Sequence, residues 1–243
     1  MRKLISVFIL FFSFFLSSQE PLFTLIDSEK TGITFSNDLV DTKDHSIFLY
    51  ANYYGGAGVG IGDFDNDGLE DIFLAANLID DKIYKNLGDF QFEDKTKLSG
   101  IINNGSWSTG VTVADVNNDG LLDIYVGNRA DQDFIVFNNP RHHGHYNLLF
   151  INQGDFKFSE IGEISGVRGN EILMIMPTGE PIEWFDEESN RWNQGYDPNL
   201  VDRKNNKVGD PSGQTLASMF WDHDQDSDVD LWISDDGDRL KVY

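Results

Sequence analysis

GDFDNDGLEDIF, residues 62–73, places five carboxylates in twelve positions and then continues as an apolar run. The pattern returns as ADVNNDGLLDIY at 114–125 and as WDHDQDSDVDLW at 221–232. Each copy has an aspartate at its first, fifth and ninth loop positions, and three apolar residues follow as positions 10 to 12. One explanation must therefore account for all three acidic loops.

The spacing of the acidic loops indicates a repeat. Position 1 is Asp63 in the first loop, Asp115 in the second and Asp222 in the third. Asp115 lies 52 residues after Asp63, and Asp222 lies 107 residues after Asp115, which is about two periods. A fixed period of this size is typical of solenoids and propellers.

The side chains of the acidic loops are those that a hard cation prefers. Clustered carboxylates repel one another unless they take up protons or a cation neutralises them. Side chains at positions 1, 3, 5 and 9 and a main-chain carbonyl at position 7 would give the six to eight oxygen ligands typical of Ca²⁺. The candidate ligands are Asp63, Asp65, Asp67, Leu69 and Asp71; Asp115, Asn117, Asp119, Leu121 and Asp123; and Asp222, Asp224, Asp226, Asp228 and Asp230.

An EF-hand and a solvated turn are two other interpretations of these loops. An EF-hand loop ends with a bidentate Glu at position 12, but that position is Leu74, Val126 or Ile233 here. Solvated hairpin tips without an ion remain an alternative, because Asp-Asn-Asp-Gly strings form turns readily. With Asn117 in place of a carboxylate, the second loop is expected to bind more weakly than the first. Ser227 stands where the turn favours glycine, as at Gly68 and Gly120, so a left-handed turn there would be strained.

A second motif repeats between the acidic loops. KIYKNLGDFQFEDKTKLSGI (82–101) and LLFINQGDFKFSEIGEISGV (148–167) share an apolar strand, an Asn-x-Gly-Asp turn, a Phe-x-Phe strand and a Ser-Gly pair. FTLIDSEKTGI, from Phe23, is a degenerate copy. Short apolar runs bounded by Gly, Asn and Asp favour strands over helices. Each unit should therefore hold four strands, which in the first unit are 58–62, 71–76, 83–86 and 90–94.

These units predict an all-β fold, a β-propeller whose four-stranded blades pack face to face. We expect each blade to bury one face on its neighbour through Ile72, Leu74, Ile124 and Val126. The glycines of GGAGVGIG (55–62) allow close backbone approach near a crowded centre. About three units can be counted, whereas propellers have typically 4–8 blades, so the expectation is an incomplete propeller whose C-terminal part is missing from this chain.

The N-terminal residues 1–18 read as a signal peptide. Arg2 and Lys3 precede an apolar run from Leu4 to Leu16, which is short for a bilayer span, and small residues follow it. The remaining 19–243 hold the blades. The chain has no cysteine and a formal net charge of −23, so disulfides are excluded and nucleic-acid binding is disfavoured. We expect a protein that is secreted or displayed at the cell surface, with no membrane span after signal removal.

These motifs resemble the FG-GAP/VCBS repeats of β-propellers, and more narrowly the cartilage acidic protein and ASPIC/UnbV-type group of secreted proteins. The resemblance covers roughly 22–167 and 213–243. It implies structural Ca²⁺ held by the aspartates and Asn117 named above. Members of the family are mostly adhesion, recognition or scaffold modules, and some enzymes carry such propellers.

Two insertions interrupt the repeat, near 131–146 and at 168–212. The first contains His142, His143 and His145, for which an exposed turn is a better interpretation than a zinc site because no fourth ligand is suitably spaced. The second carries aromatic residues that either bind a ligand or pack together, and acids that are either solvated or catalytic. The aromatic residues are Trp184, Phe185, Trp192 and Tyr196, and the acids are Glu180, Glu183, Asp186, Glu187 and Glu188.

The sequence thus predicts an exported calcium-binding β-propeller that binds an extracellular protein or carbohydrate, or acts as a scaffold. No phosphate loop, serine nucleophile elbow or cysteine nucleophile is present, so we expect no enzymatic activity. Two alternatives remain. One is a carbohydrate-active lyase or hydrolase with its site in 168–212, and the other is a purely structural surface-layer component.

Overall fold

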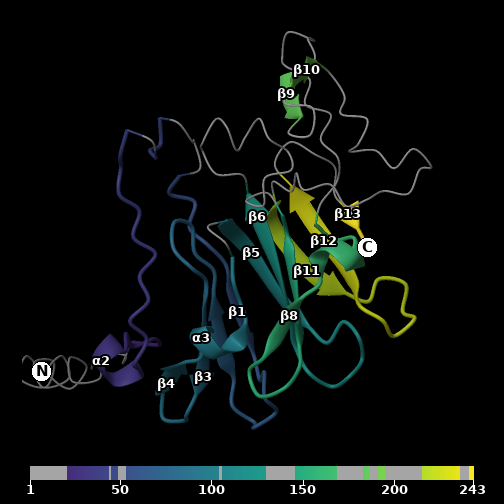
Figure 1. The fold of residues 1–243 in the computed structure, drawn as a ribbon. Coiled ribbons are helices and arrows are strands. Elements are labelled where there is room, and N and C mark those ends of the chain that lie inside the picture. The colour runs from purple at the N-terminus through teal and green to yellow at the C-terminus, as the bar shows by residue number, and fades with distance from the viewer. Residues whose placement is uncertain are drawn as a thin grey trace, which may run out of the picture.

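The computed structural model shows a chain built almost entirely from antiparallel sheets (Figure 1). The residues that it describes are 21–43, 45–48, 53–103, 106–129, 146–168, 183–186, 191–194, 215–235 and 241–243. Within them, three sheets lie side by side in chain order, as Figure 1 shows, and strand β5 of the second sheet contacts strands of both neighbouring sheets. The all-β fold class is therefore confirmed, with sheets arranged like neighbouring propeller blades.

The first two sheets have the same architecture. Each has four strands joined in sequence order, so neighbouring strands are consecutive hairpins. The strands of the first sheet are β1 (Val59–Gly62), β2 (Asp71–Leu74), β3 (Lys82–Asn86) and β4 (Phe92–Asp94). Those of the second sheet are β5 (Trp107–Ala114), β6 (Asp123–Arg129), β7 (Leu148–Asn152) and β8 (Phe158–Glu160).

The third sheet repeats the first three strands of this plan. It contains β11 (Thr215–Trp221), β12 (Asp230–Asp235) and β13 (Lys241–Val242). The register is the same in each sheet, since position 9 of each acidic loop pairs with the last residue of the first strand: Asp71 with Gly62, Asp123 with Ala114, and Asp230 with Trp221. The predicted repeat unit is thus a structural unit.

Three four-residue helices follow the repeat as well. They are α2 (Ser28–Thr31), α3 (Thr96–Ser99) and α5 (Gly162–Ser165). Each ends at a glycine with a left-handed backbone, with φ of 75° at Gly32, 78° at Gly100 and 77° at Gly166. The first helix lies in the degenerate copy that begins at Phe23, so that copy keeps the helix although no strand forms around Phe23.

Side chains of alternating positions fill the spaces between the sheets. One core cluster joins the first two sheets, with Phe73 and Ile83 from one side and Ile124, Val126 and Phe150 from the other. A second cluster joins the second and third sheets; it contains Tyr125, Leu149, Ile151, Leu231 and Ile233. Position 11 of a sheet therefore faces the next sheet, while positions 10 and 12 face the preceding one.

This arrangement corrects the predicted packing faces. Ile124 and Val126 are fully buried between sheets, as expected. Ile72 and Leu74 instead lie on the face of the first sheet that points away from the second, and they are only half-buried. The second sheet lies between two neighbours and buries one face on each of them.

Gly58, just before β1, and Gly60 within it allow the first two sheets to approach closely. A Cβ atom on Gly58 would lie 2.6 Å from the carbonyl oxygen of Thr109 and 2.7 Å from the amide nitrogen of Val111. A Cβ atom on Gly60 would lie 2.9 Å from methyl groups of both Val111 and Val113. The small-residue strand predicted from GGAGVGIG is therefore required by the backbone of the neighbouring sheet.

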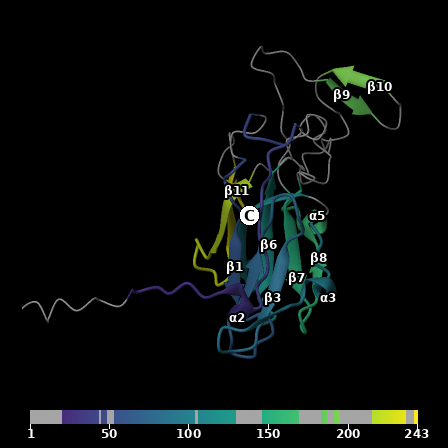
Figure 2. The same ribbon diagram turned by 90° about the vertical axis from the view of Figure 1, so that its left-hand side faces the viewer.

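Several sequence predictions lie outside the described residues. The signal peptide, the insertion near 131–146 with its three histidines, and most of 168–212 are in this group. Of the second insertion, the structure describes Arg168 and the backbone of one antiparallel hairpin, β9 (Glu183–Asp186) paired with β10 (Arg191–Gln194), visible in Figure 2. The proposed domain boundaries and the catalytic alternative therefore stay predictions.

Candidate metal centres in the acidic loops

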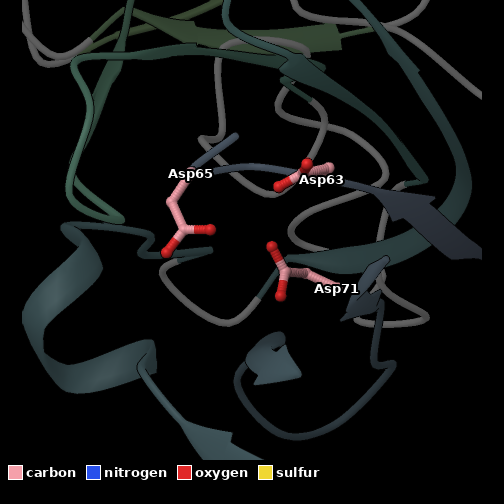
Figure 3. A group of neighbouring side chains, drawn as sticks. All are labelled: Asp63, Asp65 and Asp71. Carbon is pink, nitrogen blue, oxygen red and sulfur yellow. The ribbon is translucent and has the colours of Figure 1, made fainter. Parts of the chain in front are cut away.

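Each acidic loop connects the first two strands of its sheet. In the first loop, the side chains of Asp63, Asp65 and Asp71 point toward one another (Figure 3). One carboxylate oxygen of each lies within 4.8 Å of the others. The structure therefore brings together three of the side chains that the sequence predicted as ligands, and a single ion could contact all three.

The aspartate at position 1 accepts hydrogen bonds from backbone amides of its own loop. The Asp63 carboxylate accepts hydrogen bonds from the backbone amides of Asp67, at 3.0 Å, and Gly68, at 2.7 Å. Asp115 accepts the equivalent pair of bonds in the second loop, from Asp119 and Gly120 at 3.1 and 2.8 Å. These bonds hold the loop curved, so that alternate side chains converge on its interior.

Position 5 adds a tight turn after this curve. The carboxylate of Asp67 accepts a hydrogen bond from the amide of Leu69, and Asp119 and Asp226 do the same for Leu121 and Asp228, each at 2.9 Å. The ligand role proposed for the position 7 carbonyls remains a prediction.

Position 9 joins the loop to the third strand of the sheet. Asp71 is fully buried, and its two oxygens accept hydrogen bonds from the amides of Phe64, at 2.9 Å, and Asn86, at 2.8 Å. Burial raises the pKa of Asp71 to about 6, against the opposite effect of these two amides. Asp123 is bound in the same way by Val116 and Asn152, and burial raises its pKa as well.

The third loop also brings three acids together, but at positions 1, 3 and 5, whereas the first loop does so at positions 1, 3 and 9. Asp222, Asp224 and Asp226 each offer an oxygen within 4.8 Å of the others. At position 9, Asp230 accepts a hydrogen bond from the amide of His223 at 2.8 Å. The ring of His223 packs edge-on against the ring of Trp232 with centroids 5.1 Å apart, as expected for a side chain outside the ligand set.

The second loop differs at position 3. The amide of Asn117 donates to Asp119 Oδ2 at 3.0 Å, and its Oδ1 accepts from the Asp119 backbone at 2.9 Å. Asn117 and Asp119 are thus adjacent, as a shared ion requires. Among the described residues, the groups of three acids with converging oxygens lie in the first and third loops only.

Two buried oxygen atoms show that the loops fit a cation. Asp65 Oδ1 and Asp222 Oδ1 are both excluded from solvent and accept no hydrogen bond. A buried carboxylate oxygen without a donor is costly unless a cation contacts it. Together with a donor set made of oxygens, this fits a hard divalent metal ion.

The turn after position 5 is left-handed in all three loops. Its φ angle is 89° at Gly68, 87° at Gly120 and 80° at Ser227. The strain predicted at Ser227 therefore follows from a backbone conformation that glycine adopts freely and serine does not.

Two functional features were missed by sequence reasoning. The first is Lys85 on β3, whose ammonium group contacts Asp65 Oδ2 and lies 2.7 Å from Asp67 Oδ2. Its equivalent in the second sheet is Ile151, so the repeat pattern gave no signal for it. Burial alone would lower the pKa of Lys85, but the hydrogen bonds to both carboxylates raise it, and the same contact lowers the pKa of Asp67.

The second feature is a set of bonds between loops. Asn66, at position 4 of the first loop, donates to the carbonyl of Gly120 in the second loop at 2.9 Å. Asn118, at the same position of the second loop, donates to Asp228 in the third loop at 2.8 Å. Both asparagines have a φ of 57°, a left-handed conformation that asparagine tolerates. The sequence signal that could have indicated these bonds is the asparagine at position 4 of both loops.

In the described part of the chain, no helix is long and apolar enough to cross a membrane.

Comparisons with known proteins agree with the repeat. A family model described as FG-GAP-like repeat matches residues 63–126, from the start of the first acidic loop to strand β6. Cartilage acidic protein 1 of Xenopus tropicalis is 30% identical to this chain over 105 residues, which are 43% of this chain and 16% of that protein. The chain thus matches only a small part of that relative's length. From the first acidic loop into strand β6, this all-β chain is therefore similar to FG-GAP-like repeats, which form β-propellers.

Proposed function

We propose that this chain is an exported β-propeller module whose three acidic loops bind structural calcium and whose surface binds an extracellular protein or carbohydrate. The observation that carries the proposal is the convergence of oxygen ligands in the first and third loops, each with a buried carboxylate oxygen that lacks a hydrogen-bond donor. The repeat family supports a role in binding or as a scaffold.

The residues at positions 1, 3, 5 and 9 would hold the ion in each loop. In the first loop these are Asp63, Asp65, Asp67 and Asp71, with the carbonyl of Leu69 as a further ligand. The ion supplies positive charge to a group of carboxylates that otherwise repel one another. Calcium is favoured over magnesium because its coordination is flexible and can include six to eight oxygens.

The role of the ion would be structural. The loop joins the first two strands of a sheet, and position 9 also binds the amide of Asn86 at the end of β3. An ion at this point would stabilise three strands together, so that its binding free energy adds to the free energy of folding.

The test is thermal unfolding of the full chain in millimolar calcium and in chelator. Extracellular calcium modules bind with dissociation constants of about 10⁻⁴–10⁻³ M, so calcium at about 10 mM should raise the melting temperature clearly. Magnesium at the same concentration should raise it less. An unchanged melting temperature on chelation would count against calcium as a structural ion.

A pair of variants separates specific binding from general charge effects. Asp63→Asn removes a proposed ligand from the first loop and should reduce the calcium-dependent shift. Asp89→Asn makes the same change in charge at an exposed turn residue with a φ of 49°, where asparagine is tolerated, and should leave the shift unchanged. Equal effects of the two variants would indicate nonspecific screening.

A further inference from the structure

Lys85 is placed to affect ion binding at the first loop. Its side chain extends from β3 over the ring of Phe156, with Nζ 5.4 Å from the ring centroid. Only 20% of the side chain is exposed. The ammonium group reaches Asp65 and Asp67, which occupy positions 3 and 5 of the loop. A residue from the third strand thus shares two of the carboxylates assigned to the ion.

The second loop has no such lysine. Asn86 and Asn152 are equivalent, because each amide donates to the aspartate at position 9 of its own sheet. The residue before Asn152 is Ile151, which packs in the core between the second and third sheets. The contact between lysine and loop is therefore present in the first unit and absent from the second.

We propose that Lys85 is a tethered competitor of the divalent ion at the first acidic loop, and so sets a lower calcium affinity there than the carboxylates alone would give. This inference rests on the proposed calcium function. An ammonium group and a calcium ion that share two carboxylates repel each other, so calcium binding requires Lys85 to move away or to remain at an electrostatic cost.

The proposal changes the expected order of calcium affinities among the three loops. Four ligand carboxylates in the first loop and three in the second predicted the first as the stronger site. Counted over the ligand carboxylates alone, the positive charge of Lys85 brings the first loop to the same net charge as the second. The third loop has four ligand carboxylates and a further aspartate at position 7, so it should bind calcium most tightly.

The experiment is a calcium titration of the full chain by isothermal calorimetry. Lys85→Met keeps the apolar stem over Phe156 and removes only the charge. Lys82→Met is the matched control, since Lys82 lies on the same strand and pairs with Asp94 at 3.3 Å, away from the loop. Asp63→Asn in each background identifies the binding step of the first loop.

Lys85→Met should tighten calcium binding at the first loop by at least about fivefold, the effect of removing one partly buried ion pair. Lys85→Arg, which keeps the charge, should bind as the wild type does, and Lys82→Met should change the affinity by less than about twofold. In chelator, Lys85→Met should melt at a lower temperature than the wild type, because the carboxylates lose their counter-ion.

The outcomes are distinguishable. Calcium binding at the first loop that is unchanged or weaker in Lys85→Met overturns the competitor role while leaving the proposed function intact. Absence of calcium binding in every protein overturns the proposed function, and this inference with it. If Lys85→Met fails to fold, Lys85→Ile, which introduces the residue of the second unit, provides the same comparison.

Discussion

A buried carboxylate outside the acidic loops gives the sharpest prediction. Asp81 is 1% exposed and lies just before β3. It accepts hydrogen bonds from the amide of Ala76 at 2.8 Å, the side chain of Asn103 at 3.3 Å and the hydroxyl of Ser108 at 3.0 Å. Burial raises its pKa to about 7, against the effect of these three donors. We predict that Asp81→Asn removes a measurable pH dependence from the stability of the protein.

The sign follows from proton linkage. The pKa of Asp81 is about 7 in the folded state and about 3.9 in the unfolded chain. Between these values the folded state binds more protons, so the free energy of unfolding falls as pH rises. Integrated from pH 5 to pH 8, this single group costs about 2–3 kcal/mol of stability. Asparagine does not titrate, and its amide can donate to the Ser108 hydroxyl, so the variant should lack this loss.

The assay is urea unfolding of wild type and Asp81→Asn at several pH values and at constant calcium. The difference in free energy of unfolding, variant minus wild type, should increase by about 2–3 kcal/mol from pH 5 to pH 8. Other titrating groups, including those of the acidic loops, cancel in this difference. A difference that stays constant with pH would refute the reasoning, since Asp81 would then be charged throughout the range.

The second sheet offers a matched control. Asn147 occupies the equivalent position, is fully buried, and accepts a hydrogen bond from the amide of Asn128 at 2.8 Å. The fold therefore already accommodates asparagine at this place. Asn147→Asp should introduce the kind of pH dependence that Asp81→Asn removes. In the same experiment, its difference in free energy of unfolding, variant minus wild type, should therefore decrease from pH 5 to pH 8.

Three further predictions concern the loops and the contacts between sheets, and each is measured by urea unfolding. Ser227→Gly should stabilise the protein by about 1 kcal/mol, because glycine adopts the φ of 80° without strain; a loss of stability would contradict this. Gly58→Ala should destabilise by about 1–3 kcal/mol through collision with the backbone of β5; a change below about 0.5 kcal/mol, the size expected of a surface substitution, would show that the sheets can separate at little cost. Asn152→Ala should cost about 3 kcal/mol, because it removes the donor to the carbonyls of Phe64 and Leu122 in a buried site. The equivalent Asn86→Ala removes an exposed bond to Glu70 and should cost about 1 kcal/mol; equal costs would show that the bond between sheets has no special weight.

The strands and turns around the acidic loops were predictable from the sequence because residues close together in the chain determine them. The strands around the acidic loops form as predicted, with small differences at their ends. Phe90, for instance, was expected to begin a strand but lies in the Asn-x-Gly-Asp turn with a φ of 59°. The repeat itself carried this information, since the left-handed turn leaves asparagine at position 4 and glycine at position 6 in the first two loops.

Features that depend on neighbouring sheets were not predictable from the sequence. The apolar run from Ile72 to Leu74 does not reveal which side chains face the second sheet, because both faces of such a strand are apolar. The contact between Lys85 and the first loop joins residues 18 and 20 positions apart and has no counterpart in the second unit. The burial of Asp81 also depends on Ser108 and Asn103 from the next part of the chain.

The use of different strand positions for the two faces of a sheet has a consequence for how such chains change length in evolution. At both boundaries between sheets, position 11 of one sheet packs against positions 10 and 12 of the next. A tandem duplication of one unit in the gene would therefore create a new sheet that fits between two existing ones without any compensating substitution. Deletion of a unit would be tolerated for the same reason, so natural variation in the number of units needs no redesign of the core.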